Sequence, residues 1–387
     1  MGLRVGVVTG NHQPISGGAW TYIETLAAAV KTAECSHAFV LLDDLLLDKA
    51  QGGSKARLLR RIVRAQRDEG TGASSLDVVA AREQIDLVWL MQPWGTPLPI
   101  PYIATVWDLE HRKQPYFPEV SAKGWTFSAR ENVFNALLPR ASMIITGTQA
   151  GKDEIVHYYR VNPANVVVIP LPVPAAPPMA PQRASVEIKQ QYGLGGDFLL
   201  YPAQFWPHKN HVNLVRALRL VRDQNGLDLS LVLTGSDKGN LGHVMEEIGA
   251  AGLSDRVFVP GFVPRDHLTA LYRAAVALVF PSYFGPDNIP PLEAFALGCP
   301  VIAANVAGAA EQIGEGALLF DPSNPSDIAA KIETLCRMPG LRDKLIGKGK
   351  EIAEHRTPQA FIATLSAFLD SFEAFRRCWG GAYHHRS

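Results

Sequence analysis

Residues Pro170–Pro181 read PLPVPAAPPMAP, a stretch that contains six prolines. Proline lacks a backbone N–H and fixes φ, so this stretch can form neither a helix nor a central strand. On both sides of it, short β-branched runs alternate with helical patterns, which is typical of parallel sheets built from βα units. The sequence therefore predicts two α/β domains joined by a proline-rich linker.

Hydrophobic periodicity places strands and helices in alternation on each side of this linker. The strands expected before it are Arg4–Thr9, His37–Leu42, Leu87–Met91, Tyr102–Trp107, Met143–Gly147 and Val166–Pro170. The strands expected after it are Phe198–Pro202, Leu229–Gly235, Val257–Pro260, Ala277–Phe280, Val301–Ala304 and Ala317–Phe320. The helices expected are Ala19–Thr32, Leu76–Gln84, Gln149–Tyr159, His211–Arg222, His243–Gly249, Arg265–Ala274, Pro291–Leu297 and Pro325–Met338.

Two such domains should leave a cleft, because open parallel sheets bind ligands beyond the carboxyl ends of their strands. The last segment, Pro358–Trp379, has a helical pattern whose apolar side chains fall largely on one face. These side chains are Phe361, Leu365, Phe368, Phe372 and Phe375. We expect this helix to clamp the domains, with residues 1–178 and 179–358 as the two domains and 359–387 packing back on the first.

Charge and cysteine content narrow the classes of function. Lys plus Arg and Asp plus Glu both total 37, so no net field attracts nucleic acid and no such partner is expected. The cysteines Cys35, Cys299, Cys336 and Cys378 show no CxxC spacing, which favours a reducing compartment over a disulfide framework or zinc site. No signal peptide and no apolar run of roughly 18 residues is present. We expect a cytoplasmic protein, at most peripheral to a membrane.

Three elements carry residues suited to an anionic, hydroxylated ligand. Gly17 and Gly18 open a helix, where backbone N–H groups can face a phosphate, although a plain turn would look the same. Lys209 begins another helix at a sheet edge and is either a diphosphate ligand or a solvated charge. Within Phe280–Pro300, Glu293 lies in the first turn of the helix that follows the loop. Its carboxylate can accept hydrogen bonds from ribose hydroxyls, or merely complement the helix dipole.

Several motifs occur together in a fixed order. Around and after Lys209 stand PHKN, LVLTGS, VFVPGFVP, ALYRAA, PPLEAFALGCPVIA and AEQIGEGALLFDP. Before the linker stand SGGAW, VWDLEHRKQPYFPE, ASMIITGTQAGKDEI and VVVIPLPV. With these motifs the chain resembles the retaining GT-B glycosyltransferases of family 4 over nearly its whole length. The resemblance implies two Rossmann-like, doubly wound α/β domains facing across a cleft, with a C-terminal crossover helix.

The resemblance also assigns residues to the nucleotide-sugar donor. These residues are Gly17, Gly18, Gln204, Lys209, Phe262, Val263, Asn288, Ile289 and Glu293. Glu293 is similar to the second glutamate of the family's E-x7-E motif, which holds the ribose, and Lys209 to the lysine that binds the diphosphate. Phe262 and Val263 resemble the turn that contacts the base, and the amides of the 287–289 loop would face the sugar and phosphate.

This sequence departs from the family pattern at three positions. The first glutamate of E-x7-E is replaced by Gly285, and the arginine usual five residues before the lysine is Gln204. The histidine usual before an aspartate of the first domain is Trp107. These departures keep open an alternative, a catalytically impaired binding or scaffold subunit of a polysaccharide assembly. A sugar-nucleotide epimerase of the same architecture is a further alternative, which the absence of a glutamate at Gly285 does not favour.

We expect a variant subgroup of active enzymes, because other polar residues crowd the same loops. The catalytic residues expected are Asp108, His111, Lys209 and Asp287. Asp287 would bind sugar hydroxyls in place of the missing glutamate. For His111 the alternative is an ordinary surface histidine.

The activity that the resemblance implies is a retaining, metal-independent transfer of a hexose from a nucleotide-diphosphate sugar. No cofactor is expected, since no DxD motif stands in a suitable loop and Lys209 with helix N-termini can neutralise the leaving diphosphate. Mannose or rhamnose and a GDP-linked donor are favoured by likeness to enzymes of bacterial surface polysaccharides. The acceptor would be a lipid-linked oligosaccharide or polysaccharide, as in lipopolysaccharide synthesis.

The basic segment 55–67, KARLLRRIVRAQR, predicts a peripheral contact with an anionic membrane. At helical spacing its arginines share one face and its leucine, isoleucine and valine side chains lie opposite, as in helices that lie on a bilayer. An amphipathic helix packed on its own domain would have the same pattern.

Overall fold

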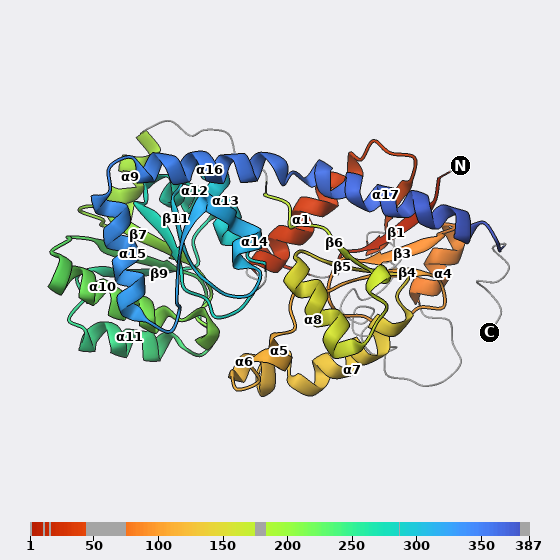
Figure 1. The fold of residues 1–387 in the computed structure, drawn as a ribbon, viewed down its shortest axis with the longest axis horizontal. Helices are drawn as coiled ribbons and strands as arrows, with labels where there is room; N and C mark the ends of the chain where they lie inside the picture. Colours follow the sequence, from red (N-terminus) through yellow and green to blue (C-terminus); the bar gives the residue numbers. More distant parts are fainter. Residues whose placement is uncertain are drawn as a thin grey trace, which may run out of the picture.

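The computed structural model describes residues 2–10, 12–14, 17–43, 75–174, 183–285 and 287–379. The basic segment 55–67 and positions 175–181 of the proline-rich stretch lie outside the described residues. Two parallel sheets lie beside each other, and two consecutive helices run along one side of both (Figure 1). This arrangement confirms the predicted α/β fold with two doubly wound sheets. The domain limits at 178 and 358 stay a prediction.

The first sheet of the described residues has the strand order β2-β1-β3-β4-β5-β6. Its strands are β1 Arg4–Val8, β2 Ala38–Leu41, β3 Leu87–Leu90, β4 Tyr102–Thr105, β5 Met143–Thr146 and β6 Val166–Val168. All pairs are parallel, and Val5 lies between Phe39 of β2 and Leu87 of β3. Strands β3, β4 and β5 are buried along their whole length, because helices cover both faces of such a sheet.

The second sheet has the order β12-β11-β10-β7-β8-β9. Its strands are β7 Phe198–Pro202, β8 Ser230–Thr234, β9 Val257–Gly261, β10 Ala277–Phe280, β11 Val301–Ala304 and β12 Ala317–Phe320. Every predicted strand is present with ends shifted by at most a few residues, since buried β-branched runs are a strong local signal. The strand order reverses between β1 and β3 and between β7 and β10. Ligands of such sheets bind beyond the carboxyl ends of the strands at these reversal points.

Helices of the described chain flank both sheets. In the first half they are α1 Gly18–Lys31, α4 Ser75–Arg82, α5 Glu110–Lys113, α6 Pro118–Ser121, α7 Phe127–Leu137 and α8 Gln149–Tyr159, with short η3 Leu138–Arg140 and η4 Pro163–Asn165. In the second half they are α9 Arg183–Gln191, η5 Pro207–Lys209, α10 His211–Asn225, α11 Leu241–Ala250, α12 Arg265–Ala274, α13 Ile289–Leu297, α14 Ala309–Ile313, η6 Gly314–Gly316, α15 Pro325–Arg337, α16 Leu341–His355 and α17 Pro358–Arg376. None of these helices combines the length and apolar character that a bilayer span requires.

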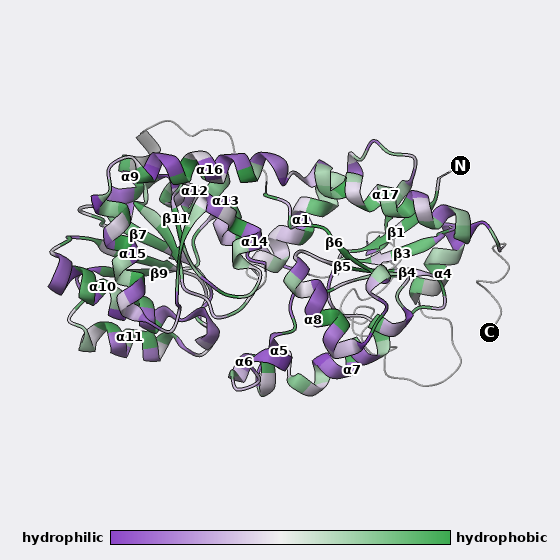
Figure 2. Cartoon of the chain, viewed as in Figure 1, coloured by the Kyte–Doolittle hydropathy of each residue, from purple (hydrophilic) through white to green (hydrophobic). Residues whose placement is uncertain are grey.

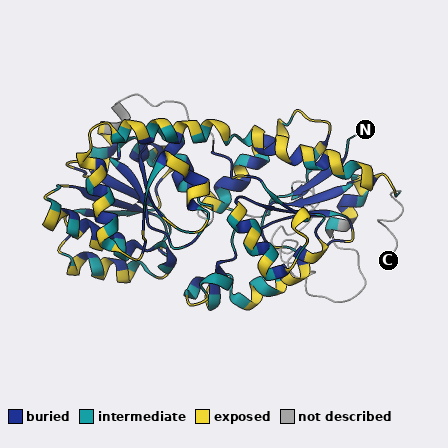
Figure 3. Ribbon diagram, viewed as in Figure 1, coloured by how far each residue is buried: buried dark blue, intermediate teal, exposed yellow. Residues whose placement is uncertain are grey.

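Helix starts follow local capping chemistry. The side chains of Thr126, Thr148 and Thr357 accept hydrogen bonds from backbone N–H groups of α7, α8 and α17, and Asn324 does the same for α15. In Figure 2 the strands are largely hydrophobic while the outer faces of the helices are hydrophilic. Figure 3 shows the same strands as buried, so the core of each domain lies between its sheet and the helices.

Six of the described α-helices were not predicted from the sequence, namely α5, α6, α7, α9, α14 and α16. Helix α16 contains Gly347 and Gly349, which weaken the helical signal. Its geometry explains one of them, because a Cβ added at Gly349 would lie 2.4 Å from Cδ1 of Phe295 in α13. Glycine therefore allows α16 to pack closely on the second domain, a tertiary reason that local pattern does not contain.

The chain returns from the second domain to the first just before helix α17, which lies along the first domain (Figure 1). Its Phe361 is 2% exposed, stacks on Trp89 of β3 at 5.9 Å and meets Tyr22 of α1 edge-on at 6.4 Å. At the crossing, the backbone N–H of Val173 in the linker donates to the carbonyl of Arg356, at 2.6 Å. Of the predicted apolar face, Phe361 and Leu365 are buried, whereas Phe375 is 68% exposed and lies off the buried face. The buried face instead includes Ile362 and Leu369, because the helix turns 100° per residue and the predicted stripe drifts away from it. The assignment of residues 359–387 to the first domain stays a prediction.

Replacing Phe361 with alanine should destabilise the protein by about 3–5 kcal/mol, since a buried aromatic side chain leaves a cavity against Trp89 and Tyr22. The matched control is Phe375→Ala in the same helix, which should change stability by less than about 0.5 kcal/mol. Urea unfolding of both variants measures the difference. Equal losses in the two variants would contradict the docking of α17 through Phe361.

Candidate functional site

Three adjoining cavities line the cleft where the carboxyl ends of the two sheets face each other. The central cavity, about 350 Å³, is bounded by both domains, from Gly17 and Trp107 on one side to Lys209 and Asp287 on the other. A second cavity of about 380 Å³, here called the Glu293 cavity because Glu293 lines it, shares Gly17, Gly18 and Gln204 with the central cavity. A third cavity of about 320 Å³, the Asp108 cavity, is lined by Asp108 and shares Lys209 and Asp287 with the central cavity. Together they form an elongated site at the reversal points of the two sheets.

The starts of two helices converge on the central cavity. Gly17, with φ +65°, precedes α1, and a Cβ added at Gly18 would lie 3.6 Å from Ile289 at the start of α13. The positive φ of Gly17 is a conformation that glycine adopts without strain. Two helix N-termini therefore present their positive dipole ends to one space. The backbone N–H of Asn288 at the start of α13 already donates a hydrogen bond to Oε1 of Gln312, at 3.0 Å.

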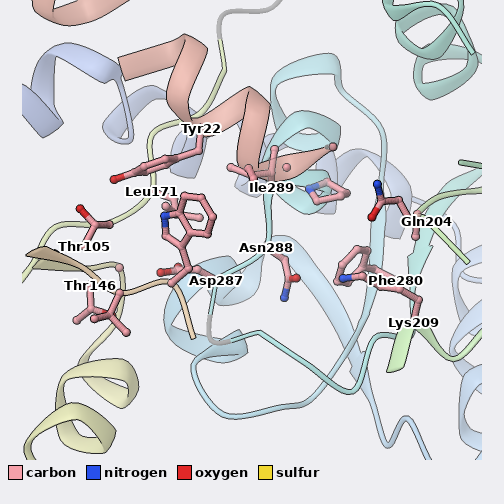
Figure 4. A pocket seen from close by; sticks show the side chains of 18 of the residues that line it. Tyr22, Thr105, Thr146, Leu171, Gln204, Lys209, Phe280, Asp287, Asn288 and Ile289 are labelled. Carbon is pink, nitrogen blue, oxygen red and sulfur yellow. The ribbon is translucent and has the colours of Figure 1, made fainter. Parts of the chain in front are cut away.

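Lys209 supplies the positive charge of the central cavity. Its Nζ lies 3.5 Å from Oγ of Ser282 and 5.5 Å from the centre of the Phe280 ring, and among the described residues it forms no ion pair. Figure 4 shows its side chain beside Phe280 and Gln204, across the cavity from Thr105 and Thr146. Burial lowers the pKa of Lys209 to about 8, although nearby carboxylates raise it, so the ammonium is still the main form at pH 7. It is a cation suited to an anionic ligand.

Strand and loop geometry hold Lys209 in place. The hydroxyl of Tyr201 in β7 donates to the carbonyl of Lys209 at 2.8 Å. The next residue, Asn210, has a left-handed backbone with φ 58° and donates its side-chain amide to the carbonyls of Pro281 and Pro322. The loop between β7 and α10 is thus fixed to the loops after β10 and β12, which presents the lysine at the edge of the sheet.

The Glu293 cavity combines a carboxylate with an apolar surface. Oε2 of Glu293 accepts a hydrogen bond from the hydroxyl of Tyr272 at 3.0 Å. Burial raises the pKa of Glu293, while that hydrogen bond and the charge of Arg265 lower it. Phe262 and Val263 line the same cavity, and the Phe262 ring is largely exposed to it and to solvent. This end offers a hydrogen-bond acceptor next to a surface on which a flat ring can lie.

The Asp108 cavity contains paired charges. Oδ1 of Asp108 lies 2.8 Å from Nη1 of Arg130, and it also accepts the backbone N–H of Glu110. Burial alone would raise the pKa of Asp108, but the guanidinium and the N–H outweigh it and the pKa is lowered. Glu119 of α6 binds both the backbone N–H and the ring of His208, so this contact joins the two domains.

Asp287 lies between the central and the Asp108 cavities. Burial raises its pKa to about 7, with Arg356 acting in the opposite direction. Its Oδ1 is buried and has no hydrogen-bond partner among the described residues. A Cβ added at Gly147 of the first domain would lie 1.5 Å from Oδ2, so glycine at that position lets the carboxyl group reach across the cleft.

Among the predicted site residues, His111 lies outside the three cavities. It is fully buried. Its Nε2 lies 2.7 Å from Oε1 of Glu131 and 3.3 Å from the hydroxyl of Tyr159, and Arg112 pairs with the same glutamate. His111 therefore belongs to a network that ties α5, α7 and α8 together. A catalytic role for it stays a prediction, whereas the other predicted residues all line the cavities.

Sequence analysis missed several residues of the site. Trp125 lies in the loop before the unpredicted helix α7, Arg130 lies in the first turn of α7, and Glu119 lies in the single-turn helix α6. No local pattern distinguishes them from surface residues, because their partners come from distant segments. His208 could have been predicted, because it directly precedes Lys209 in the segment Trp-Pro-His-Lys-Asn. Among the described residues, no cluster of His, Cys, Asp and Glu side chains has an arrangement that could hold a metal ion.

Comparison with known families and curated proteins gives a consistent result for both halves of the chain. The family described as "Glycosyl transferases group 1" matches residues 185–352, and "Glycosyltransferase Family 4" matches residues 16–176. The O-antigen chain mannosyltransferase B of Escherichia coli is 27% identical over 209 residues, which are 52% of this chain and 53% of that protein. The D-inositol 3-phosphate glycosyltransferase of Corynebacterium kroppenstedtii is 26% identical over 248 residues, 61% of this chain and 54% of that protein. The chain spans about half the length of these curated relatives.

A solved structure shares the fold. HepE of Anabaena, in complex with UDP and glucose, superposes with a TM-score of 0.69 at 16% identity, covering 95% of this chain and 100% of that chain. At this identity the likeness shows that the two chains share a fold, and it does not identify the ligand of this chain.

Acidification should destabilise the contact between the domains. Burial lowers the pKa of His208 to about 4 from an ordinary 6.5, so between these values the unfolded chain binds a proton that the folded chain does not. Stability should therefore fall as the pH decreases from about 6.5 to 4, and the lowered pKa of Glu119 extends the loss to lower pH.

The variant His208→Gln should flatten the dependence of the urea midpoint on pH between 7 and 5. It should not abolish the dependence, because burial also lowers the pKa of His211, to about 3. The control is His243→Gln, a change at an exposed histidine of α11, which should leave the dependence unchanged. An unchanged slope in His208→Gln would show that His208 is not a neutral group in the folded protein.

Proposed function

This chain belongs to glycosyltransferase family 4 and has the GT-B fold, and from that premise we propose that it transfers a hexose from a nucleotide-diphosphate sugar with retention of anomeric configuration. The observation that carries the proposal is the Lys209 ammonium, which has no ion-pair partner among the described residues and lines one cavity with the starts of α1 and α13. A diphosphate bound there would place the nucleoside in the Glu293 cavity and the donor sugar beside Asp287, within the central cavity.

The Glu293 cavity is the proposed nucleoside site. The carboxylate of Glu293, held on one oxygen by Tyr272, can accept hydrogen bonds from ribose hydroxyls. Phe262 and Val263 provide an apolar surface beside it on which a base can pack. The cavity adjoins the central cavity through Gly17, Gly18 and Gln204, so the nucleoside and the diphosphate would be contiguous.

The central cavity is the proposed diphosphate site. Transfer breaks the bond between the anomeric carbon and the diphosphate oxygen, and negative charge develops on that oxygen. Lys209 and the N-termini of α1 and α13 would stabilise the charge from fixed positions, with Gln204 in place of the family's arginine. By resemblance to the family, the acceptor hydroxyl forms the new bond on the same face and gives its proton to the leaving phosphate. Metal independence rests on the same resemblance.

Asp287 is the proposed carboxyl group for the donor sugar, and a catalytic role for Asp108 stays a prediction. Asp287 stands two residues after Gly285 and lines both the central and the Asp108 cavities, and its buried Oδ1 has no hydrogen-bond partner among the described residues. It can accept a hydrogen bond from a sugar hydroxyl, which supports the idea that it replaces the missing glutamate. Asn288 and Ile289 line the same wall and would contact the donor next to it.

For the donor we propose a GDP-linked sugar with mannose or rhamnose. The support is the likeness to an O-antigen chain mannosyltransferase, which also favours a lipid-linked oligosaccharide or polysaccharide acceptor of a lipopolysaccharide pathway at the cytoplasmic face of a membrane. The UDP and glucose bound in the HepE structure favour a UDP-linked donor instead, and nucleotide binding can distinguish the two.

A nucleotide screen tests the proposed function. A nucleoside diphosphate at about 100 times its dissociation constant should add about 2.7 kcal/mol to the stability, visible as a rise in Tm. We expect GDP, rather than UDP, ADP or dTDP, to give this rise, and Lys209→Ala and Glu293→Gln to lose it. With an identified donor, Lys209→Ala should also lower kcat by about a hundredfold or more. The control, Lys344→Ala at an exposed position of α16, should keep both properties. No response to any nucleotide would refute the proposed donor site.

Membrane contact through the basic segment 55–67 stays a prediction and has its own test. Replacing Arg57, Arg60, Arg61, Arg64 and Arg67 with glutamine should release the protein from vesicles that contain phosphatidylglycerol, since each charge contributes about 1 kcal/mol near an anionic surface. Vesicle sedimentation measures binding, with replacement of Arg216, Arg219 and Arg222 in α10 as the control. Equal binding of the two variants would refute the prediction.

A further inference from the structure

The Asp108 cavity lies beyond the diphosphate site, on the side of the first domain. Trp125 and Arg130 line it from α7 and its preceding loop, and Lys209 and Asp287 line it from the second domain. Its volume is about 320 Å³, and neither Trp125 nor Arg130 lines the central or the Glu293 cavity. A ligand in this part of the site would therefore meet groups that neither nucleoside nor diphosphate touches.

Two carboxylates of this wall, those of Asp108 and Glu119, already have partners. The Arg130 guanidinium binds Asp108 at 2.8 Å through Nη1, donates through Nε to the carbonyl of Trp125 at 3.0 Å, and stacks over the Trp125 ring at 4.5 Å. Glu119 is bound by His208. Lys209 is the lining cation of the described residues that forms no ion pair, and it lies at the boundary with the central cavity, where the diphosphate is proposed.

Aromatic side chains form a fixed part of the same wall. Trp125 is held edge-on by Trp94 at 5.3 Å and by Phe134 at 5.3 Å, and Trp107 is held edge-on by Tyr22 at 5.7 Å. The face of an aromatic ring carries a partial negative charge and attracts polarised C–H groups, such as those on the face of a pyranose. Rings that neighbours hold in place lose little entropy when such a ligand packs on them.

Three buried polar atoms of this wall have no hydrogen-bond partner among the described residues. They are the indole Nε1 of Trp107, which can only donate, Oε2 of Glu119 and Oδ1 of Asp287. Trp107 and Asp287 line the Asp108 cavity as well as the central cavity. A buried polar group without a partner costs free energy, which a bound ligand with hydrogen-bonding groups recovers. A hydroxyl group donates and accepts, so sugar hydroxyls match an indole N–H and a carboxyl oxygen at one place.

We infer that the Asp108 cavity binds an uncharged pyranose ring of a glycan acceptor, seated on Trp125 and Trp107, and that the Asp108–Arg130 pair excludes phosphorylated acceptors. The inference rests on the proposed transferase function and specifies its acceptor. Arg130 is the guanidinium that would otherwise bind a phosphate, and Asp108 occupies it. A phosphorylated acceptor would have to displace this carboxylate, and its own charge would be repelled by Asp108 and Glu119.

Saturation-transfer NMR on the protein saturated with the stabilising nucleoside diphosphate tests the inference. The probes are methyl α-D-mannopyranoside and methyl α-D-glucopyranoside, each compared with its 6-phosphate. We expect the uncharged member of at least one pair to bind about tenfold more tightly than its phosphate. Tighter binding of the phosphates, or no binding of either uncharged glycoside, would overturn the inference. The nucleotide-induced rise in Tm distinguishes this failure from failure of the proposed donor site, because it reports on the donor alone.

Two variants make the test specific. Asp108→Asn frees the Arg130 guanidinium and should shift the ratio of affinities toward the phosphates by about tenfold. Trp125→Leu should abolish binding of the glycosides while keeping the nucleotide-induced rise in Tm. Its matched control is Trp379→Leu, which lies after α17 and lines none of the three cavities, and which should keep glycoside binding. An unchanged ratio in Asp108→Asn would overturn the role of the ion pair even if Trp125→Leu failed to fold.

Discussion

The packing of Phe361 in α17 against Trp89 and Tyr22 is the contact on which the site depends. Each wall of the cleft comes from a different domain, with Gly17, Trp107 and Asp108 on one side and Lys209, Asp287 and Glu293 on the other. The chain crosses between the domains at the linker and again before α17, and the two crossings are joined by the hydrogen bond from Val173 to Arg356. Apolar burial of one helix thereby sets which polar groups face each other.

Charge distribution gives the cleft its selectivity. Arg130 neutralises the charge of Asp108 in the wall of the first domain, and Glu119 accepts a hydrogen bond from the backbone N–H of His208 at the junction with the second domain. Lys209 stays without an ion-pair partner among the described residues, and its burial lowers its pKa to about 8. Keeping a buried ammonium unpaired destabilises the ligand-free protein, and an anion that binds there recovers the lost free energy. One cation without an ion-pair partner among the described residues therefore favours an anionic group at one defined place in the cleft.

Close approach of the two domains requires glycine where side chains from the other domain arrive. Gly147 accommodates the carboxyl group of Asp287, and Gly18 lets the start of α1 lie against Ile289 of α13. The same principle operates inside the second domain, where Gly349 makes room for Phe295. A side chain at Gly147 would displace Asp287 from the junction of the central and Asp108 cavities, so the composition of these short loops shapes the site as much as its charged residues do.

The sequence by itself determined the strands, most long helices and the choice of Lys209 and Glu293 as residues that line the cleft, because buried β-branched runs and ordered motifs are local signals. The division at Pro170–Pro181 and the donor contacts of Lys209 and Glu293 stay predictions. The sequence did not predict α16, whose glycines weaken the helical pattern, or the short helices α5 and α6. Only the tertiary structure decided that His111 is buried behind the cleft while Arg130, Trp125 and Glu119 line it. These side chains contact residues that are distant in the sequence, and some of these residues belong to the other domain. Such contacts produce no periodic pattern in the sequence.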